Sequence, residues 1–544
     1  MNRKLSSLLY LLLLLLNMLE AKAQSSDANY VKTETFTSED RNSCQVTIDY
    51  LDKKGRLAQQ VSNSLGNGNI LRTYYEYDAG GRLCKVSLPL DSQSDMAYKK
   101  SHDLSAESEN TYQGDKYGYT EYRYDALGNM VSALGPGYDW FDDERDLACE
   151  YLTNLDGEVK KYDVSPNDAS LISGGFYAKG DLSCVVTTDE DRHTAKVYYD
   201  KLGRKILERQ TARENHDTYF VYNNLGQLCY VLTPKFQENE DIQSFAYQYA
   251  YDGRGRMVSK FIPSCGNTEY WYDSADRLVL MQNARLRSKG LYRFYMYDAL
   301  NRLCLQGNCT KADNMNQRND IKYQSKASGI GGTEYVCSGN ASLQNAVVEE
   351  VRYYDNYDFL QGNLLGGSAA STKLHENTSL GNGNTSILLS IEKSQTRGLL
   401  TGKVQRTSSE EVISFAHYYD GRGRLVETTS AYGESRSLLV GYKLNYVGQV
   451  SESMSLATSG DESYSLFTRN SYHGKTGKFL SCELSINGAP FHAVSNYDYD
   501  NVGRIRTYRQ GKSTTNYKYN MHGWLRNITS PGLDEELMYT YVLY

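Results

Sequence analysis

One short pattern recurs along this 544-residue chain and constrains its fold more than any other feature. Its consensus is Tyr-x-Tyr-Asp-x-x-Gly-Arg-Leu, as in "YEYDAGGRL" at 75–83 and "YAYDGRGRM" at 249–257. The two tyrosines fall on one face of a strand because strand side chains alternate. Asp favours the first position of a type I turn, and Gly three residues later supplies the positive φ that closes it. Each copy therefore predicts one tight β-hairpin.

The copies stay in phase, at intervals of about 20–30 residues, along most of the chain. The turn residues that they predict are Asp78, Gly81, Asp125, Gly128, Asp200, Gly203, Asp252, Gly255, Asp273, Asp298, Asp420, Gly423, Asp500 and Gly503. Wider gaps predict degenerate copies, with Asn154, Tyr177 and Gly474 in the Asp position. A lone hairpin is marginal in water, so the hairpins must join edge to edge. The predicted fold is all-β, with tandem hairpins in one long sheet.

Residues 1–23 read as a signal peptide, with Arg3 and Lys4 before a leucine run and Ala21-Lys22-Ala23 at its end. This predicts cleavage before Gln24, and hence an exported protein without a transmembrane segment. The expected organisation is an N-terminal β domain at 24–150, repeat arrays at 151–304 and 411–544, and an interrupted or degenerate region at 305–410 with a flexible loop at 366–386. The final "LMYTYVLY" at 537–544 predicts a hairpin that stops after its first strand.

Composition agrees with a strand-rich chain. There are 49 Tyr against 13 Phe and 45 Gly against 7 Pro, which suits half-buried sheet faces and turns of positive φ. The formal net charge is -7, so no nucleic-acid partner is expected. The ten Cys lack C-x-x-C spacing, which argues against a zinc site or a disulfide framework and favours buried thiols.

The recurring Asp could in principle supply catalytic carboxylates or calcium ligands. Asn replaces it at 223, 445 and 520, which keeps hydrogen bonding but not acid–base chemistry, so turn capping is the better interpretation. We predict no catalytic, cofactor-binding or metal residue, and no enzyme. The arginines after Gly are expected to pair with acids of neighbouring hairpins or to face solvent. The paired tyrosines are expected to pack across strands, with ligand binding as the alternative.

These motifs resemble the RHS/YD-repeat family over 74–303 and 418–525, and residues 29–61 are similar to the N-terminal domain that precedes such repeats in exported bacterial RHS proteins. The resemblance implies a spiralling sheet that forms a shell, in which complete members can enclose a C-terminal toxin. The core segment and self-cleavage motif of toxin carriers have no counterpart here.

The predicted function is an exported, non-enzymatic shell scaffold of a cell-surface or toxin-delivery system, with a toxin cargo or a downstream polypeptide as partner. The alternative is a surface adhesin that binds glycans or a partner cell. A gene remnant without activity is the third possibility.

Overall fold

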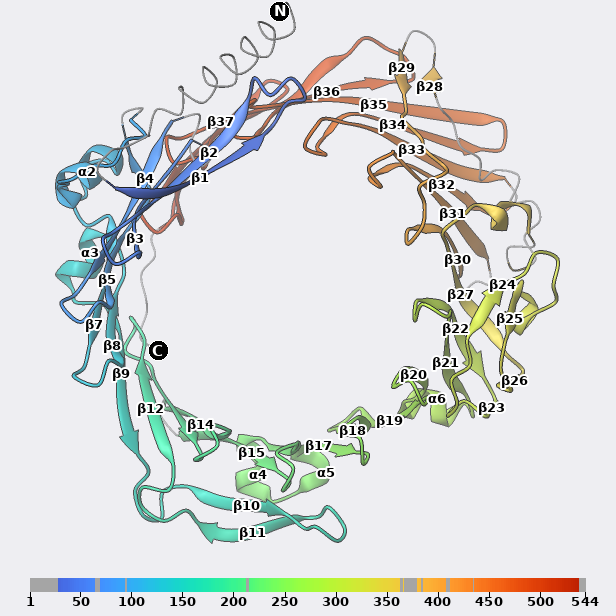
Figure 1. The fold of residues 1–544 in the computed structure, drawn as a ribbon, viewed down its shortest axis with the longest axis horizontal. Helices are drawn as coiled ribbons and strands as arrows, with labels where there is room; N and C mark the ends of the chain where they lie inside the picture. Colours follow the sequence, from blue (N-terminus) through green and yellow to red (C-terminus); the bar gives the residue numbers. More distant parts are fainter. Residues whose placement is uncertain are drawn as a thin grey trace, which may run out of the picture.

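The computed structural model describes residues 28–63, 69–92, 95–211, 215–362, 365, 379–382, 385–407, 411–433 and 435–537. The predicted signal peptide and the strand expected at 539–541 lie outside these residues. Within them, 33 strands form one sheet that curves into a ring (Figure 1). The prediction of an all-β fold with one long sheet is confirmed.

Most neighbours in the sheet are consecutive strands of the chain, except where an outer segment lies between them, and every strand pair is antiparallel. The first part contains β1 (Asn29–Phe36), β2 (Cys44–Leu51), β3 (Leu57–Ser62), β4 (Leu71–Tyr77), β5 (Leu83–Ser87), β6 (Leu90–Asp91), β7 (Tyr119–Tyr124), β8 (Met130–Leu134) and β9 (Asp146–Thr153). β4 pairs with both β5 and β6, and β5 continues to β7. The boundary expected at 150/151 falls inside β9, and the sheet runs through it.

In the sheet, the middle part begins with β12, which pairs with β9. It contains β12 (Ser183–Thr188), β13 (Thr194–Tyr199), β14 (Lys205–Thr211), β15 (Asn215–Tyr222), β16 (Leu228–Leu232), β17 (Ala246–Tyr251), β18 (Met257–Ile262), β19 (Gly266–Tyr272), β20 (Leu278–Gln282), β21 (Tyr292–Tyr297) and β22 (Leu303–Cys309). β22 pairs with β27 (Val347–Tyr354), so the sheet also continues across the boundary expected at 304/305.

The last part runs from β27 to the other end of the sheet. It contains β30 (Leu400–Arg406), β31 (Val412–Tyr419), β32 (Leu425–Tyr432), β33 (Arg436–Leu444), β34 (Val450–Ser459), β35 (Glu462–Tyr472), β36 (Phe479–Ile486), β37 (His492–Tyr499), β38 (Ile505–Gln510), β39 (Ser513–Tyr519), β40 (Leu525–Ser530) and β41 (Leu533–Glu536).

Shorter elements lie on the outer side of the ring (Figure 1). They include the small hairpins β10 (Lys160–Val164) with β11 (Leu171–Phe176), β23 (Lys311–Asp313) with β26 (Ser342–Gln344), β24 (Ile321–Tyr323) with β25 (Tyr335–Cys337), and β28 (Ser379–Asn382) with β29 (Thr385–Leu388). The helices are α2 (Leu104–Thr111), α3 (Tyr138–Asp142), α4 (Pro234–Asn239), α5 (Ile242–Phe245), α6 (Ala284–Ser288) and two 3-10 turns, η1 (Ile330–Gly332) and η2 (Asp358–Gln361). The prediction of a loop at 366–386 is wrong for its end, where β28 pairs with β29, and 366–378 lies outside the described residues.

The main apolar cores form where these outer segments cover the sheet. One core joins Phe294, Met296 and Tyr418 of the sheet to Tyr335 and Phe359 of the 310–346 and 356–398 segments. A second lies under the β10–β11 hairpin and α4, around Tyr198 and Phe236. Side chains alternate along each strand, so the residues between these buried positions face the inside of the ring.

Two hairpins of the sheet have turns that are opened by an insertion. Asn154 directly follows β9. Its N–H donates to Leu182 O (3.2 Å), and Gly180 N–H donates to Asn154 O (3.1 Å), as in an ordinary turn of the repeat. The β10–β11 hairpin is inserted between the two halves. The prediction of two separate degenerate copies at Asn154 and Tyr177 is therefore wrong: they belong to one turn.

The second split turn joins β27 to β30. Asp355 N–H donates to Leu399 O (3.1 Å), and Gly398, at φ +86°, donates its N–H to the Asp355 carboxylate (2.7 Å). The described residues between 356 and 397 lie outside the main sheet, between these halves. The 305–410 region thus contains one outer insertion before β27 and a second one inside the turn of the β27–β30 hairpin.

The two ends of the ring meet through side chains and one hairpin tip. Among the described residues β1 pairs only with β2 and β41 only with β40. Thr37 and Ser43 donate their hydroxyls to Gly474 O (2.7 and 2.8 Å). Further along, Trp140 packs on His522, with ring centroids 4.1 Å apart, and His522 stacks on Trp524 at 4.9 Å. We call the contacts of Thr37 and Ser43 with Gly474, together with the Trp140, His522 and Trp524 cluster, the seam. In Figure 1 the blue strands β1 and β2 lie beside the red strands β36 and β37.

Gly423 tests the turn geometry. It has φ +73° and no close neighbour, so Gly423→Val adds backbone strain of about 1–2 kcal/mol without a clash, and the melting temperature should fall. Gly423→Asn should be milder, because Asn301 adopts φ +64° at the same position of another turn. Gly421→Val, in the same turn but without positive φ, is the matched control. Equal melting of all three variants would contradict this account.

His522 should make the seam sensitive to acid. Burial lowers the pKa of His522 below its ordinary 6.5, against the opposing charges of Glu190, Asp115 and Asp139. The unfolded state then binds a proton at His522 more readily than the folded state does. The folded state with neutral His522 therefore has its full stability above pH 6.5, and that stability falls as the pH drops below this value. Hydrogen exchange at the seam, corrected for intrinsic rates, should be less protected at about pH 5.5 than at about pH 7.5.

His522→Phe keeps an aromatic ring at the seam and removes the titration. The pH dependence of protection at the seam should therefore disappear in this variant. An unchanged pH response would assign the effect to other groups.

Candidate functional site

The turns of the repeat are closed by one recurring set of hydrogen bonds. Asp200 N–H donates to Arg204 O (3.0 Å), and Gly203 N–H donates to Asp200 O (2.9 Å). The Asp200 carboxylate accepts the N–H groups of Leu202 and Arg204, both at 2.9 Å, and the Arg204 Nε–H at 2.7 Å. The same Nε–carboxylate contact, at 2.7 Å, occurs at Asp78, Asp252, Asp273, Asp298, Asp420 and Asp500.

Two of the predicted turns lack glycine at the closing position. Asp276 and Asn301 adopt φ +61° and +64° there, following Asp273 and Asp298. The Asp125 turn keeps Gly128, but Asn129 replaces the arginine and donates its side-chain amide to Asp125 (2.9 Å). The capping carboxylate is thus common to all the Asp copies, while its donor varies.

Each arginine also holds the next hairpin. Arg82 lies 4.9 Å from the ring centre of Tyr124 and donates Nη1–H to Asp125 O (2.9 Å). Arg504 contacts Tyr519 and Asn520 O in the same way, at 4.9 and 3.0 Å. The acidic partner common to the arginines is the Asp of their own turn, which the prediction missed. The predicted pairing with acids of the next hairpin is confirmed for Arg256 with Asp276 (2.7 Å) and for Arg302 with Asp355 (2.6 Å). Cation–π contacts of this kind contribute about 0.5–1 kcal/mol at exposed sites and more when desolvated.

The tyrosine before each Asp completes the link between hairpins. Tyr251 OH donates to Leu228 O (2.9 Å) and Tyr297 OH to Leu278 O (2.8 Å), in each case at the start of the preceding return strand. We call the combined Asp, Arg and Tyr contacts the ladder. Cross-strand packing between the paired tyrosines, which the sequence led us to expect, is not the main contact of this second tyrosine.

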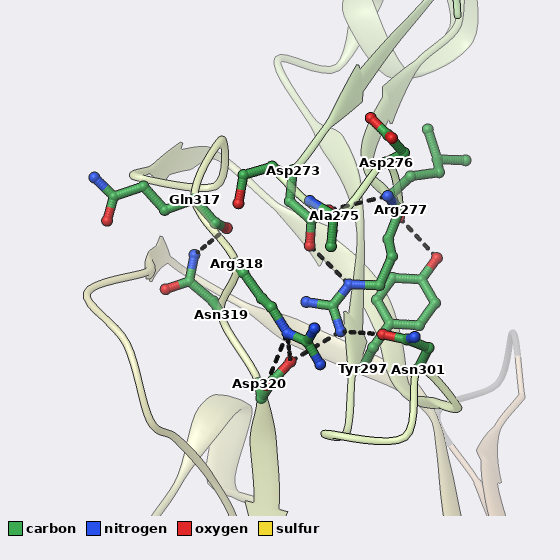
Figure 2. A network of polar contacts seen from close by, with 12 residues as sticks. Asp273, Ala275, Asp276, Arg277, Tyr297, Asn301, Gln317, Arg318, Asn319 and Asp320 are labelled. Atoms are coloured by element: carbon green, nitrogen blue, oxygen red, sulfur yellow. Dashed lines mark hydrogen bonds and ion pairs between the residues drawn. The ribbon is translucent and has the colours of Figure 1, made fainter.

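The ladder is most buried at Asp273 and Arg277, whose side chains are 0% and 8% exposed (Figure 2). Arg277 donates Nε–H to Asp273 at 2.7 Å and Nη1–H to Asp320 at 2.9 Å. Asp320 belongs to the outer 310–346 insertion and is also bound by Arg318 at 3.0 Å. This network ties the insertion to the sheet.

Amide pairs replace the ion pair at Asn223 and Asn445, whereas the Asn520 side chain accepts the backbone N–H of Trp524 (2.9 Å) instead. Asn223 donates Nδ2–H to Gln227 Oε1 (2.8 Å), and Asn445 does the same to Gln449 (2.9 Å). Gln449 in turn donates to Gly477 O of the next hairpin (2.7 Å), as an arginine would. Asp with Arg and Asn with Gln are therefore two complementary versions of one contact.

The ladder carboxylates are poorly suited to catalysis. At Asp78 the backbone N–H of Arg82, followed by its side chain, holds the pKa of the carboxyl below the usual 3.8, so it stays ionised and saturated with donors. In the described residues no group of three or more His, Cys, Asp or Glu side chains could hold a metal ion. All ten cysteines are unpaired. The prediction of buried thiols is confirmed for Cys149, Cys184, Cys229, Cys304 and Cys309, whereas Cys44, Cys84, Cys337 and Cys482 are half-buried and Cys265 is exposed.

Several ladder turns escaped the sequence analysis. "YLDKKGRL" at 50–57 forms a full turn between β2 and β3, with Arg56 Nε–H at 2.8 Å from Asp52 and its guanidinium 4.0 Å from the ring centre of Tyr77. Leu51 in place of tyrosine hid this copy. Near the other end the turn residue is His473, not Gly474, because His473 N–H donates to Lys478 O (2.8 Å).

The residue two positions before Asp, which we call the outer slot, follows a clear rule. Where an outer segment covers it, the side chain is aromatic or aliphatic and buried, as at Tyr50, Tyr198, Val221, Met296, Tyr353 and Tyr418. Where nothing covers it, the residue is polar or alanine, as at Arg123, Ala250, Lys443, Ser471, Asp498 and Lys518, whereas Glu76 is half-buried and bonded to His102 (2.9 Å). Leu152 and Trp271 break the rule, because they are apolar and exposed.

Residues 24–153 match a family model described as a domain of unknown function, DUF6443. No curated protein matches the chain. Among solved structures, the chain is similar to "TcdB2-TccC3 without hypervariable C-terminal region", with a TM-score of 0.59 and 12% identity over 93% of this chain and 22% of that chain. The structure of TcdB2-TccC3 itself gives 0.43 and 13% identity over 92% and 24%.

At this identity the likeness concerns the fold, and this chain spans about a fifth of the length of the chain that it matches. Together with the recurring hairpins, the structure with a TM-score of 0.59 supports a β-rich fold of the same kind. No helix among the described residues is long and apolar enough to cross a bilayer.

The complementary pairs give a test of the ladder. Asp420→Asn removes the ionic partner of Arg424 and should destabilise the protein by about 1–2 kcal/mol. Adding Arg424→Gln recreates the pair found at Asn223 and Gln227. The double variant should therefore lose less stability than Asp420→Asn and Arg424→Gln lose separately when their losses are added, by at least about 0.5 kcal/mol. The measurement is a double-mutant cycle by thermal or urea unfolding. Strict additivity would argue against a coupled contact.

Proposed function

We propose that this protein is an exported, non-enzymatic shell scaffold that encloses a polypeptide. The observation that carries the proposal is the single curved sheet whose ends return to each other at the seam (Figure 1). The likeness of fold to TcdB2-TccC3 without its hypervariable C-terminal region supports the choice of a shell.

The two faces of the sheet differ in a way that suits enclosure. The large apolar insertions cover the outer face, and among the described residues no such segment lies on the inner face. It carries half-buried tyrosines such as Tyr249, Tyr251, Tyr270 and Tyr272. Tyrosine gives an amphipathic lining, able to contact an unfolded chain without the strong adhesion of a purely apolar wall.

Export, membership of the YD-repeat family and a role in toxin delivery belong to the same proposal. Export rests on the basic, leucine-rich and small-residue segments of residues 1–23. The partner would be a toxin cargo or a polypeptide encoded downstream. The ladder would keep the hairpins of the curved sheet in place around this partner.

Protection from protease tests enclosure. The full chain is co-expressed with the polypeptide encoded immediately downstream, and the two are purified together. The partner should be cleaved by trypsin at least about tenfold more slowly with the shell than alone, because cleavage requires an exposed, open segment. A shell with Trp140→Ala and Trp524→Ala should protect less, since the seam is weakened. Equal cleavage with and without the intact shell would refute enclosure.

A further inference from the structure

The tips of four consecutive hairpins of the sheet each present one leucine to the solvent. They are Leu127 in the β7–β8 turn, Leu155 in the split β9–β12 turn, Leu202 in the β13–β14 turn and Leu225 in the β15–β16 turn, with exposed fractions of 61% to 88%. We call these four residues the leucine row. Successive tips are two strands apart, so the row extends over about 30 Å of the turn edge of the sheet.

The leucine row departs from what most other turns of the chain carry at this position. There the residue is polar or small at Lys54, Gly80, Arg254, Ala275 and Arg422. Leu300, Val447 and Val502 are apolar, but no adjacent tip among the described turns carries a second exposed large apolar residue. Single exposed apolar side chains are normal on a soluble protein, whereas contiguous ones mark an interaction site.

The backbone N–H of each leucine in the row is already bonded within its own turn. The acceptors are Asp125 Oδ1 for Leu127 (2.9 Å), Glu158 Oε2 for Leu155 (2.8 Å), Asp200 Oδ1 for Leu202 (2.9 Å) and Asn223 Oδ1 for Leu225 (3.0 Å). A backbone donor that loses water without gaining a partner costs several kcal/mol in an apolar medium. These four tips can therefore leave water without leaving the leucine amides unpaired.

The tips form a convex edge rather than a groove. A Cβ added at Gly157, Gly180, Gly203 or Gly226, beside three of the leucines, would meet no atom within 4 Å. An edge about 30 Å long and one sheet, about 10 Å, thick offers less than the roughly 800 Å² that each partner buries in a stable protein complex. A fluid surface, which adapts to separate protruding side chains, is the better complement.

The charges around the row indicate which lipids such a surface would contain. The turn residues 125–129, 154–158, 177–181, 200–204 and 223–227 hold five acidic and three basic side chains: Asp125, Asp156, Glu158, Asp181 and Asp200 against Lys179, Lys201 and Arg204. Anionic bilayers attract basic segments, so this edge gains nothing from anionic lipid.

We propose that the leucine row docks on the interface of a zwitterionic lipid bilayer. The four side chains enter the boundary between headgroups and acyl chains, where the carbonyl groups of the turns still contact water. The row lies on the turn edge of the sheet, so this docking does not depend on the enclosure of a polypeptide.

Co-sedimentation with phosphatidylcholine vesicles tests this proposal. The chain from Gln24 is used, because it contains every described residue and lacks the leucine-rich residues 8–16, which would bind lipid themselves. Half of the protein should be bound at about 0.1–1 mM lipid, close to the affinity of a single myristoyl chain. Replacing part of the lipid by phosphatidylserine should not strengthen binding.

The variants separate the leucine row from non-specific contact. Leu202→Arg with Leu225→Arg should raise the lipid concentration for half-binding at least about tenfold, because two of the four insertions are lost. Arginine already occupies this turn position at Arg254 and Arg422, so the fold should be kept. Arg254→Leu extends the row by one tip and should lower that concentration at least about twofold. Ile486→Ser, at an exposed residue that ends β36 away from its turn, is the control and should change nothing.

Circular dichroism confirms that each variant is folded. The proposal is overturned if the chain does not sediment with phosphatidylcholine vesicles at up to about 5 mM lipid, or if the folded double arginine variant binds them as well as the original chain. Binding to phosphatidylserine vesicles alone would also overturn it, since charge would then drive the contact. A dimer in light scattering that the double variant abolishes, without lipid binding, would instead make the row a contact between two copies.

Discussion

The contact between one arginine and two successive hairpins is the interaction on which this structure depends. Arg82 is held by Asp78 of its own turn and in turn holds Tyr124 and the backbone of Asp125 in the next. A hairpin alone has too little apolar surface to be stable, and strand pairing alone does not fix how the tips of adjacent hairpins sit. The ladder supplies that geometry from charge-assisted and aromatic contacts, which are directional.

The hairpin unit could be predicted from sequence because its chemistry is local. Asp420, Gly423 and the residues between them define one turn within a few positions of chain, and the strand alternation follows from the tyrosines. The partners of Arg424 could not be predicted, because its contact with Asn445 O depends on which strand lies next in the sheet. The seam, formed by residues from opposite ends of the chain, left no local signal for the same reason.

The split turns show a different limit. Asn154 and Gly180 make one turn although a hairpin separates them, so a search for a continuous motif finds two weak copies instead of one interrupted copy. Asp355 and Gly398 repeat the arrangement with a longer insertion. In both cases the hydrogen bonds of the turn persist, which shows that the strand pairing on either side, rather than the covalent connection, holds the two halves together.

The outward direction of these insertions has a consequence for how such proteins can change. A segment added at a turn adds a new external module without altering the number of strands around the ring or the side chains that line its interior. The diameter of the ring and the segments on its outer face can therefore vary independently. Two chains of very different length could surround the same volume, and chains of equal length could surround different ones.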